Sequence, residues 1–258
     1  MYNEKDIISK WNSEMYDCNE TDTDDVEFAV SVIGTEPKRI LEIACGSGRF
    51  LVPMANAGHD VTGLDFDEHM LNRIAAKIAS TQNISWHKAD VINDEWETGF
   101  EIVLLVANFL SNIVSDMDFE QAQELMIKKA AGSLVSGGYL LIDYAYTFYP
   151  EKWVNNPNPN IVWQGTDSEG NSGKMVLLNN TYDKETGIAK CTRRFEMTLA
   201  DGSILIQEIP TEKHFATIEQ VREWLKRSGF VIENEWGDYQ GNPISEETSR
   251  AIIWAKKL

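Results

Sequence analysis

The sequence predicts an α/β protein: a Rossmann-like, doubly wound sheet of seven strands with an inserted antiparallel β-hairpin lid. Over residues 38–145, short apolar runs alternate with segments of helical periodicity. After residue 150 the apolar residues alternate with period two instead, and a helical segment and two apolar runs return near the C-terminus. Strands separated by helices pair in parallel through right-handed crossovers, whereas period-two segments joined by short turns form antiparallel hairpins. We therefore expect both kinds of sheet.

Two helices are expected before the sheet. Residues 7–16 carry Ile8, Trp11 and Met15 at helical spacing, and residues 24–33 form a second helical stretch. Apolar runs and helical patterns then alternate along the chain. They predict strands at residues 39–43, 60–64, 84–87, 102–106 and 138–144, the last after a turn at residues 136–138, and helices at residues 49–57, 68–79 and 119–134.

The period-two pattern is clearest over residues 189–199. Cys191, Phe195 and Met197 share one face of this segment, and Arg193 is a charged residue on that otherwise apolar face. After the hairpins, the pattern predicts a helix at residues 217–227 and strands at 230–233 and 250–255. We expect a single domain over residues 1–258, with an N-terminal helical cap at 1–35, a Rossmann-like core at 38–145 and 216–258, and the inserted antiparallel lid at 151–215.

Composition and charge argue against several classes of partner. The 258 residues hold 41 acidic and 23 basic side chains, which gives a formal net charge of -18. A surface this negative repels phosphate backbones, so we expect neither nucleic acid nor a membrane as a partner. The first residues do not resemble a secretory signal, and no apolar stretch approaches the roughly 20 residues of a membrane-spanning helix. The three cysteines are widely spaced, so we expect a reducing, cytoplasmic compartment.

The residues most typical of a ligand-binding site follow the first predicted strand. Gly46 and Gly48 stand at a junction between strand and helix, where glycines let a ligand approach the backbone closely. A dinucleotide-binding motif would have a third glycine at position 51, but Leu51 is there, which argues against a nicotinamide oxidoreductase. Glu42, at the end of the strand, would repel a pyrophosphate and suits a ligand that is cationic or rich in N–H and O–H donors.

The pattern Glu42-x-x-x-Gly46-x-Gly48 resembles the first motif of class I S-adenosylmethionine-dependent methyltransferases. The resemblance implies that Asp65, after the second strand, accepts hydrogen bonds from the ribose hydroxyls. It also implies that Asp90, after the third, takes up the adenine amino group. S-adenosylmethionine is then the expected cofactor and S-adenosylhomocysteine the product. The cofactor-binding residues implied are Glu42, Ala44, Gly46, Gly48, Asp65, Phe66, Met70, Asp90, Val91 and Ala107.

Each of these residues also has a purely structural interpretation. The glycines could form only a tight turn, Asp65 could be a helix N-cap, and Asp90 a surface acid. Cys45, inside the motif, is better explained as a small core residue than as a nucleophile, because no histidine is near it in sequence. The four histidines show no metal-ligand spacing, and we expect no metal.

The resemblance extends to the acceptor side of the site. Asn108 matches an Asn found in glycine-methyltransferase-like and sugar-amine-methylating relatives, but Asn112 stands where they often have a His. After the fifth strand, a glycine-type enzyme would place an Arg to hold the substrate carboxylate, whereas this chain has Tyr144-Ala145-Tyr146, so glycine is a poor substrate prediction. We offer Arg193 as an anion clamp for the substrate, although a snorkelling or ion-paired Arg is the common alternative. The acceptor-side candidates are Tyr16, Asn108, Asn112, Tyr144, Tyr146 and Arg193.

These observations predict transfer of a methyl group to a small-molecule amine or hydroxyl by in-line displacement. The protein must align the nucleophile with the methyl group and exclude water, and no residue is assigned as a catalytic base. A methyltransferase for peptides or proteins, and a SAM-binding protein without catalysis, remain alternatives. The oligomeric state is left open.

Overall fold

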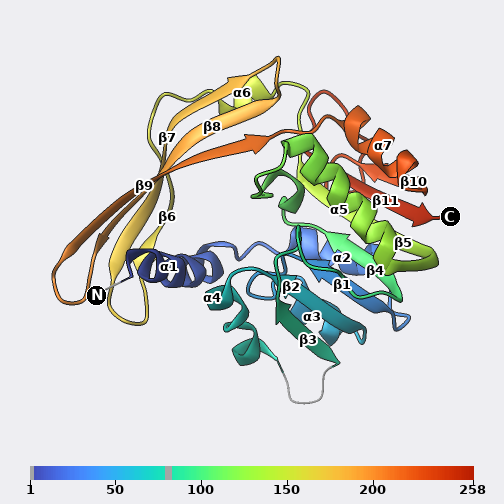
Figure 1. Cartoon of the computed structure of the whole chain (residues 1–258), viewed down its shortest axis with the longest axis horizontal. Helices are drawn as coiled ribbons and strands as arrows, with labels where there is room; N and C mark the ends of the chain where they lie inside the picture. The colour runs from blue at the N-terminus through green and yellow to red at the C-terminus, as the bar shows by residue number, and fades with distance from the viewer. Residues whose placement is uncertain (1–2, 79–82) are drawn as a thin grey trace. The chain divides into compact units, whose positions relative to one another are not determined.

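The computed structural model describes residues 3–78 and 83–258. The chain divides into two compact units: Met1–Asp22 with Tyr149–His214, and Thr23–Phe148 with Phe215–Leu258. Figure 1 shows both. Each unit has its own sheet and its own hydrophobic core, and each is described by itself below.

The second unit holds a seven-stranded sheet with the order β10-β11-β5-β4-β1-β2-β3. Five strands run parallel, while β11 pairs antiparallel with both β5 and β10. This arrangement confirms the predicted fold class. The strands are β1 (Arg39–Ile43), β2 (Asp60–Asp65), β3 (Ile84–Lys88), β4 (Phe100–Leu105), β5 (Leu134–Ala145), β10 (Phe230–Trp236) and β11 (Arg250–Lys257).

Helices cover both faces of this sheet because successive strand residues point to opposite sides. In β1, Leu41 packs into the cluster under α5 and α7, whereas Ile40 packs into the cluster under α2 and α3. The helices are α2 (Asp24–Ile33), α3 (Leu51–Asn56), α4 (Glu68–Leu71), α5 (Phe119–Ser133) and α7 (Ile218–Arg227), with short 3-10 segments η1 (Ile74–Lys77) and η2 (Phe109–Ser111).

Two sequence predictions were wrong in detail. The helix expected at residues 68–79 is α4 followed by η1, and residue 79 lies outside the described residues. The tighter η1 turn buries Ile74 completely and lets the Lys77 ammonium donate to the Ser47 carbonyl at 2.8 Å. The turn expected at residues 136–138 is instead part of β5, where a register shift and close packing of Gly138 on the Glu101 carbonyl carry the strand through.

The first unit is a four-stranded antiparallel sheet with the order β6-β7-β8-β9. One end of one face is covered by α1 (Glu4–Asn19), whose Ile8, Trp11 and Met15 pack on Phe195 and its neighbours. The Trp11 and Phe195 rings meet edge to face at 6.3 Å. The remaining elements are α6 (Pro150–Val154), β6 (Asn160–Thr166), β7 (Ser172–Asp183), β8 (Ile188–Thr198) and β9 (Ile204–His214).

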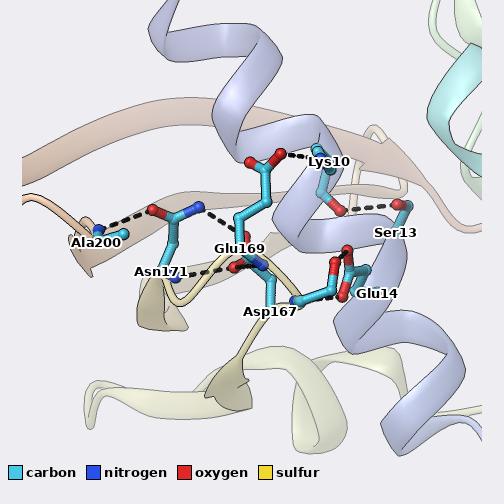
Figure 2. A network of polar contacts seen from close by, with 8 residues as sticks. Lys10, Ser13, Glu14, Asp167, Glu169, Asn171 and Ala200 are labelled. Atoms are coloured by element: carbon cyan, nitrogen blue, oxygen red, sulfur yellow. Dashed lines mark hydrogen bonds and ion pairs between the residues drawn. The ribbon is translucent and has the colours of Figure 1, made fainter.

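A polar network fastens α1 to the turn between β6 and β7 (Figure 2). Glu14 accepts hydrogen bonds from the Ser168 backbone N–H and hydroxyl at 2.8 and 2.7 Å, and Lys10 pairs with Glu169. The turn is held in shape by Asp167, which accepts from the Asn171 backbone and side-chain amides, both at 2.8 Å. Helix and sheet of this unit are thus joined by polar as well as apolar contacts. Within the described residues, no helix is long and apolar enough to cross a membrane.

Candidate active site

The candidate site of the second unit lies where three parallel strands end together. Because β1, β2 and β3 are neighbours, their carboxyl ends bring Glu42, Asp65 and Asp90 to one edge of the sheet. Open α/β sheets bind ligands at this edge. The loop after β1 contributes the two glycines of the motif.

The two motif glycines do different things. Both have positive φ, +55° at Gly46 and +85° at Gly48. A Cβ at Gly46 would meet no atom within 4 Å, so the space beside it is free of protein. A Cβ at Gly48 would come within 3.1 Å of Val52 and 3.2 Å of Ile74. Gly48 therefore allows close packing, and Gly46 leaves room for a ligand.

Gly63 is a residue that the sequence analysis did not single out. It pairs with Glu42 across β1 and β2, and a Cβ there would come within 2.8 Å of the Leu51 side chain and 2.7 Å of the Cys45 sulfur. A dinucleotide-binding motif would have a glycine at position 51, whereas here Gly63 on β2 leaves the room that the Leu51 side chain occupies. A glycine inside a strand was the available signal for this close approach.

Asp65 ties the end of β2 to the glycine loop. Its carboxylate accepts hydrogen bonds from the Gly46 N–H at 2.8 Å and the Asp67 N–H at 2.7 Å. Burial raises the pKa of Asp65, and these backbone donors oppose that rise. Asp67 is the N-cap of α4, accepting from the His69 N–H, so the capping interpretation of Asp65 is wrong. Two hydrogen bonds leave a carboxylate with further acceptor capacity.

Glu42 is a buried acid with an unsatisfied oxygen. Only 3% of the residue is exposed, and Oε2 has no hydrogen-bond partner. Burial raises the pKa of Glu42 well above its usual value, and the nearby Arg49 partly opposes this. Arg49 itself forms an ion pair with Asp25 at 2.7 Å. Leaving a buried carboxyl oxygen unpaired is costly, which favours a ligand that supplies a donor there.

Asp90 organises the loop after β3. Oδ1 accepts from the Ile92 and Asn93 N–H groups at 3.0 and 3.2 Å, and Oδ2 accepts from the Asn93 side chain at 2.8 Å. These bonds, led by the Asn93 side chain, lower the pKa of Asp90. Asp90 is therefore charged and held in a defined direction at the edge of the sheet.

Lys129 was not anticipated from the sequence, although it shapes the same loop from α5. Its ammonium donates to the carbonyls of Val91, Ile92 and Asp94 at 2.8, 2.7 and 2.7 Å. Val91 also accepts from the Trp96 indole at 3.0 Å. No local pattern marks Lys129, because its partners are more than 30 residues away in sequence.

Asn108 joins the ends of β4 and β5. It adopts φ +61°, and its side-chain oxygen accepts from the Ala145 N–H at 2.7 Å and from Arg250 at 3.3 Å. Asn112 donates to the Asn108 carbonyl at 2.9 Å. Ala107 has φ +54°, so two successive residues take the left-handed conformation where β4 ends. The structure thus assigns Asn108 a positioning contact and brings Asn112 beside it.

Tyr144 and Tyr146 lie in the core cluster under α5 and α7, 1% and 6% exposed, with ring centroids 6.1 Å apart. The Tyr144 hydroxyl is buried without a partner. Burial raises the pKa of both phenols, that of Tyr146 to about 12, so both are neutral at physiological pH. Their contribution to an acceptor site stays a prediction.

The other predicted residues are spread over both units. In the second, Phe66 is 73% exposed beside Asp65, and Met70 is half-buried on α4. In the first, the Tyr16 ring meets Trp163 edge to face at 5.8 Å, and Arg193 lies on β8 with its Nε buried and without a partner. The structure therefore brings the cofactor-side residues together in one unit and divides the acceptor-side candidates.

Cys45 packs inside the motif as a protonated thiol. It is 3% exposed, and burial raises its pKa. It contacts the position of Gly63, which fits the role of a small core residue. Among the residues described, no group of three or more His, Cys, Asp or Glu side chains is arranged to hold a metal ion.

Comparisons with known proteins agree with this geometry. Residues 40–138 match the family described as a methyltransferase domain. YqeM of Bacillus subtilis (strain 168), provisionally assigned as a methyltransferase, is 24% identical over 228 residues, covering 86% of this chain and 85% of its own. Glycine N-methyltransferase of Rattus norvegicus is 22% identical over 153 residues, 55% of this chain and 52% of its own.

Solved structures share the fold across most of the chain. An S-adenosylmethionine-dependent methyltransferase from Clostridium acetobutylicum has a TM-score of 0.70 at 16% identity, covering 90% of each chain. The sugar N-methyltransferase KedS8 from Streptoalloteichus also has a TM-score of 0.70 at 16% identity, covering 92% of this chain and 90% of its own. Residues 40–138 thus match a methyltransferase domain, and the strand order and fold of the chain are similar to those of S-adenosylmethionine-dependent methyltransferases.

Proposed function

We propose that S-adenosylmethionine binds at the carboxyl ends of β1, β2 and β3. The observation that carries the proposal is the free space at Gly46, whose N–H donates to the Asp65 carboxylate, together with the unsatisfied oxygen of Glu42 on the preceding strand. The donors and positive charge of this cofactor suit such a set of acceptors. Ala44, Gly46 and Gly48 would hold the methionine end against the backbone of the loop.

The remaining cofactor residues follow the order of the strands. Asp65 has acceptor capacity left for the ribose hydroxyls, and the exposed ring of Phe66 offers an apolar surface for the adenine. Asp90 and the Val91 backbone would meet the adenine edge, held by Lys129. Met70 and Ala107 complete the proposed set.

The bound cofactor would supply an electrophilic methyl group, already activated by the sulfonium. The work left to the chain is to orient both reactants in line and to keep water out. Alignment of this kind can lower a barrier by as much as roughly 7 to 11 kcal/mol. No catalytic base is required when the acceptor is an amine that arrives deprotonated.

We further propose a small-molecule amine or hydroxyl as the acceptor. Support comes from fold neighbours whose titles describe a sugar N-methyltransferase and an amino pentose methyltransferase, and from the negative net charge, which disfavours nucleic acid. Another neighbour is a glycopeptide N-methyltransferase, which keeps a peptide acceptor as the second candidate. We expect the reaction to take place in the cytoplasm.

Calorimetric titration with S-adenosylmethionine tests the cofactor site. Asp65→Asn keeps an acceptor for the Gly46 N–H but removes the charge, and we expect a loss of about 10- to 100-fold in affinity, the equivalent of about 1.5–3 kcal/mol. Asp60→Asn, at the other end of the same strand, is the matched control and should bind as the wild type does. Unchanged affinity in Asp65→Asn would refute the ribose assignment. Binding of NADH in place of S-adenosylmethionine would refute the cofactor.

A further inference from the structure

The sheet of the first unit carries two cations on one face without any acidic partner. The register of β8 with β9 pairs Ala189 with Lys213 and Arg193 with Ile209. Side chains of paired residues share a face, and so do residues four apart in a strand, so Arg193 and Lys213 point to the same side. This is the side whose other end is covered by α1 through Phe195 and Met197.

Both side chains are withdrawn from water. Arg193 and Lys213 are half-buried, and the Arg193 Nε is fully buried without a hydrogen-bond partner. Within the described part of the chain, neither side chain forms an ion pair with a carboxylate. Burial and the charge of Arg193 lower the pKa of Lys213.

On the opposite face of the same sheet, lysine and arginine side chains form ion pairs with carboxylates. There Lys174 pairs with Glu196 at 2.9 Å and Lys190 pairs with Glu212 at 2.8 Å. Arg194, the neighbour of Arg193, pairs with Glu196 at 2.8 Å and with Glu208 at 2.9 Å. The ion-paired interpretation of Arg193 is therefore wrong, because the carboxylates of these strands face the other way.

Two desolvated like charges are costly to hold in a folded protein. An arginine cannot release its proton, so the charge of Arg193 can be neutralised only by an anion, and an anion bound there would also favour the charged form of Lys213. Lys213 pairs with Ala189, four positions along β8 from Arg193, and the two long side chains share one face. A guanidinium presents a planar donor fork and an ammonium a compact positive charge, and both suit the oxygens of a carboxylate or a phosphate. The Gln207 amide on the same face also has a buried oxygen without a partner, and rotation of this amide would present its N–H donors instead.

We propose that Arg193 and Lys213 form a binding site for an oxyanion, a carboxylate or phosphate group of a small molecule. The site belongs to the first unit alone. The binding of the anion does not depend on the proposed function.

Titration of the full chain with sodium phosphate and with sodium acetate, at ionic strength matched with sodium chloride, tests the site. We expect one or both anions to bind the wild type, and Arg193→Gln and Lys213→Gln each to weaken binding at least tenfold. Arg194→Gln, one residue along on the other face, is the matched control and should bind within twofold of the wild type. Phosphate alone would identify a phosphoryl group, and acetate alone a carboxylate; either supports the site.

Melting temperature without added anion separates this site from a structural arginine. Removing an unpaired, desolvated charge should leave Arg193→Gln as stable as the wild type or more so, whereas Arg194→Gln loses two ion pairs and should not gain. Arg193→Lys retains the charge and should recover part of the binding if Arg193→Gln folds poorly. No binding of either anion to the wild type, or equal binding by the variants, would overturn the site. Because S-adenosylmethionine titration is independent, its failure would overturn the proposed function and leave this result unaffected.

Discussion

At the scale of single residues, Gly46 and Gly48 lie in the same loop but in different surroundings. A Cβ at Gly48 would press against Val52 and Ile74, whereas the space beside Gly46 is open. Ala44, at φ +56°, shows that a residue with a Cβ can take the left-handed conformation in this loop. Backbone conformation alone therefore does not explain why position 46 is a glycine.

This difference leads to a prediction for Gly46→Ala. The left-handed conformation costs a residue with a Cβ roughly 1–2 kcal/mol, so the variant should fold with that loss of stability. The added methyl group enters the proposed cofactor space, and titration calorimetry should show a loss of S-adenosylmethionine affinity of at least about tenfold.

Gly229→Ala is the control, since Gly229 also has positive φ and open space around it but follows α7, away from the motif. It should lose similar stability and no affinity. Equal affinity of Gly46→Ala and the wild type would mean that the open space at Gly46 is not where the cofactor binds.

At the scale of elements, the loop between β3 and β4 depends on α5. Three backbone carbonyls of the loop converge on the Lys129 ammonium, which also lies 5.5 Å from the centre of the Trp96 ring. The loop carries Asp90 and Val91, so a helix on one face of the sheet controls residues proposed for adenine binding.

Lys129 contacts the loop and is not one of the residues proposed to contact the cofactor. We still expect Lys129→Met to weaken S-adenosylmethionine binding, because it loosens the loop. Charged donors contribute about 1.5–3 kcal/mol per hydrogen bond when buried, and partial exposure reduces this, so we expect a stability loss of about 1–2 kcal/mol and a several-fold loss of affinity. Chemical denaturation and calorimetry measure the two effects.

Lys128→Met changes the exposed neighbour on α5 and should alter neither property. If Lys129→Met destabilised the protein but bound the cofactor normally, the loop would not take part in adenine recognition.

At the scale of the whole molecule, one buried acid links pH to stability. Asp143 pairs with Arg250 at 2.7 Å and accepts from the Tyr239 hydroxyl at 3.0 Å, which joins β5, β11 and the segment between β10 and β11. Burial raises the pKa of Asp143 to about 6, although Arg250 and Tyr239 lower it. The unfolded chain has an ordinary value of about 3.9.

The sign of the effect follows from which state holds the proton. Between about pH 4 and pH 6 the folded protein binds a proton at Asp143 that the unfolded chain releases, so this group's contribution to stability is present below about pH 4 and lost as the pH rises through 6. The loss amounts to about 3 kcal/mol. Asp143→Asn removes it.

Urea denaturation at several pH values measures this contribution. As the pH rises from 4 to 7, the free energy of unfolding of Asp143→Asn should increase relative to that of the wild type by up to about 3 kcal/mol. Asp60→Asn, a substitution of an exposed acid, should follow the wild-type profile. A constant difference between Asp143→Asn and the wild type would show that Asp143 is ionised throughout.

The order of the elements and the class of the fold could be predicted from the sequence. Periodicity reports which face of a segment is buried, and it placed α2 and β1 at the observed bounds. It failed where the backbone tightens to a 3-10 turn at η1 and where β5 runs on through Gly137 and Gly138, because both depend on packing against distant residues. The motif acids were also found from sequence, since strand ends are local features.

The contacts of each side chain could not be predicted from the sequence and became known from the three-dimensional structure. Lys129 and Gly63 act on partners brought close by the crossover connections, and Asn108 is engaged by β5 and β11. Arg193 could be judged only once the register of β8 and β9 showed that it shares a face with Lys213 and that the carboxylates lie on the other. Local patterns follow from residues near in sequence, whereas burial, pairing and the pKa of a group depend on neighbours that folding alone supplies.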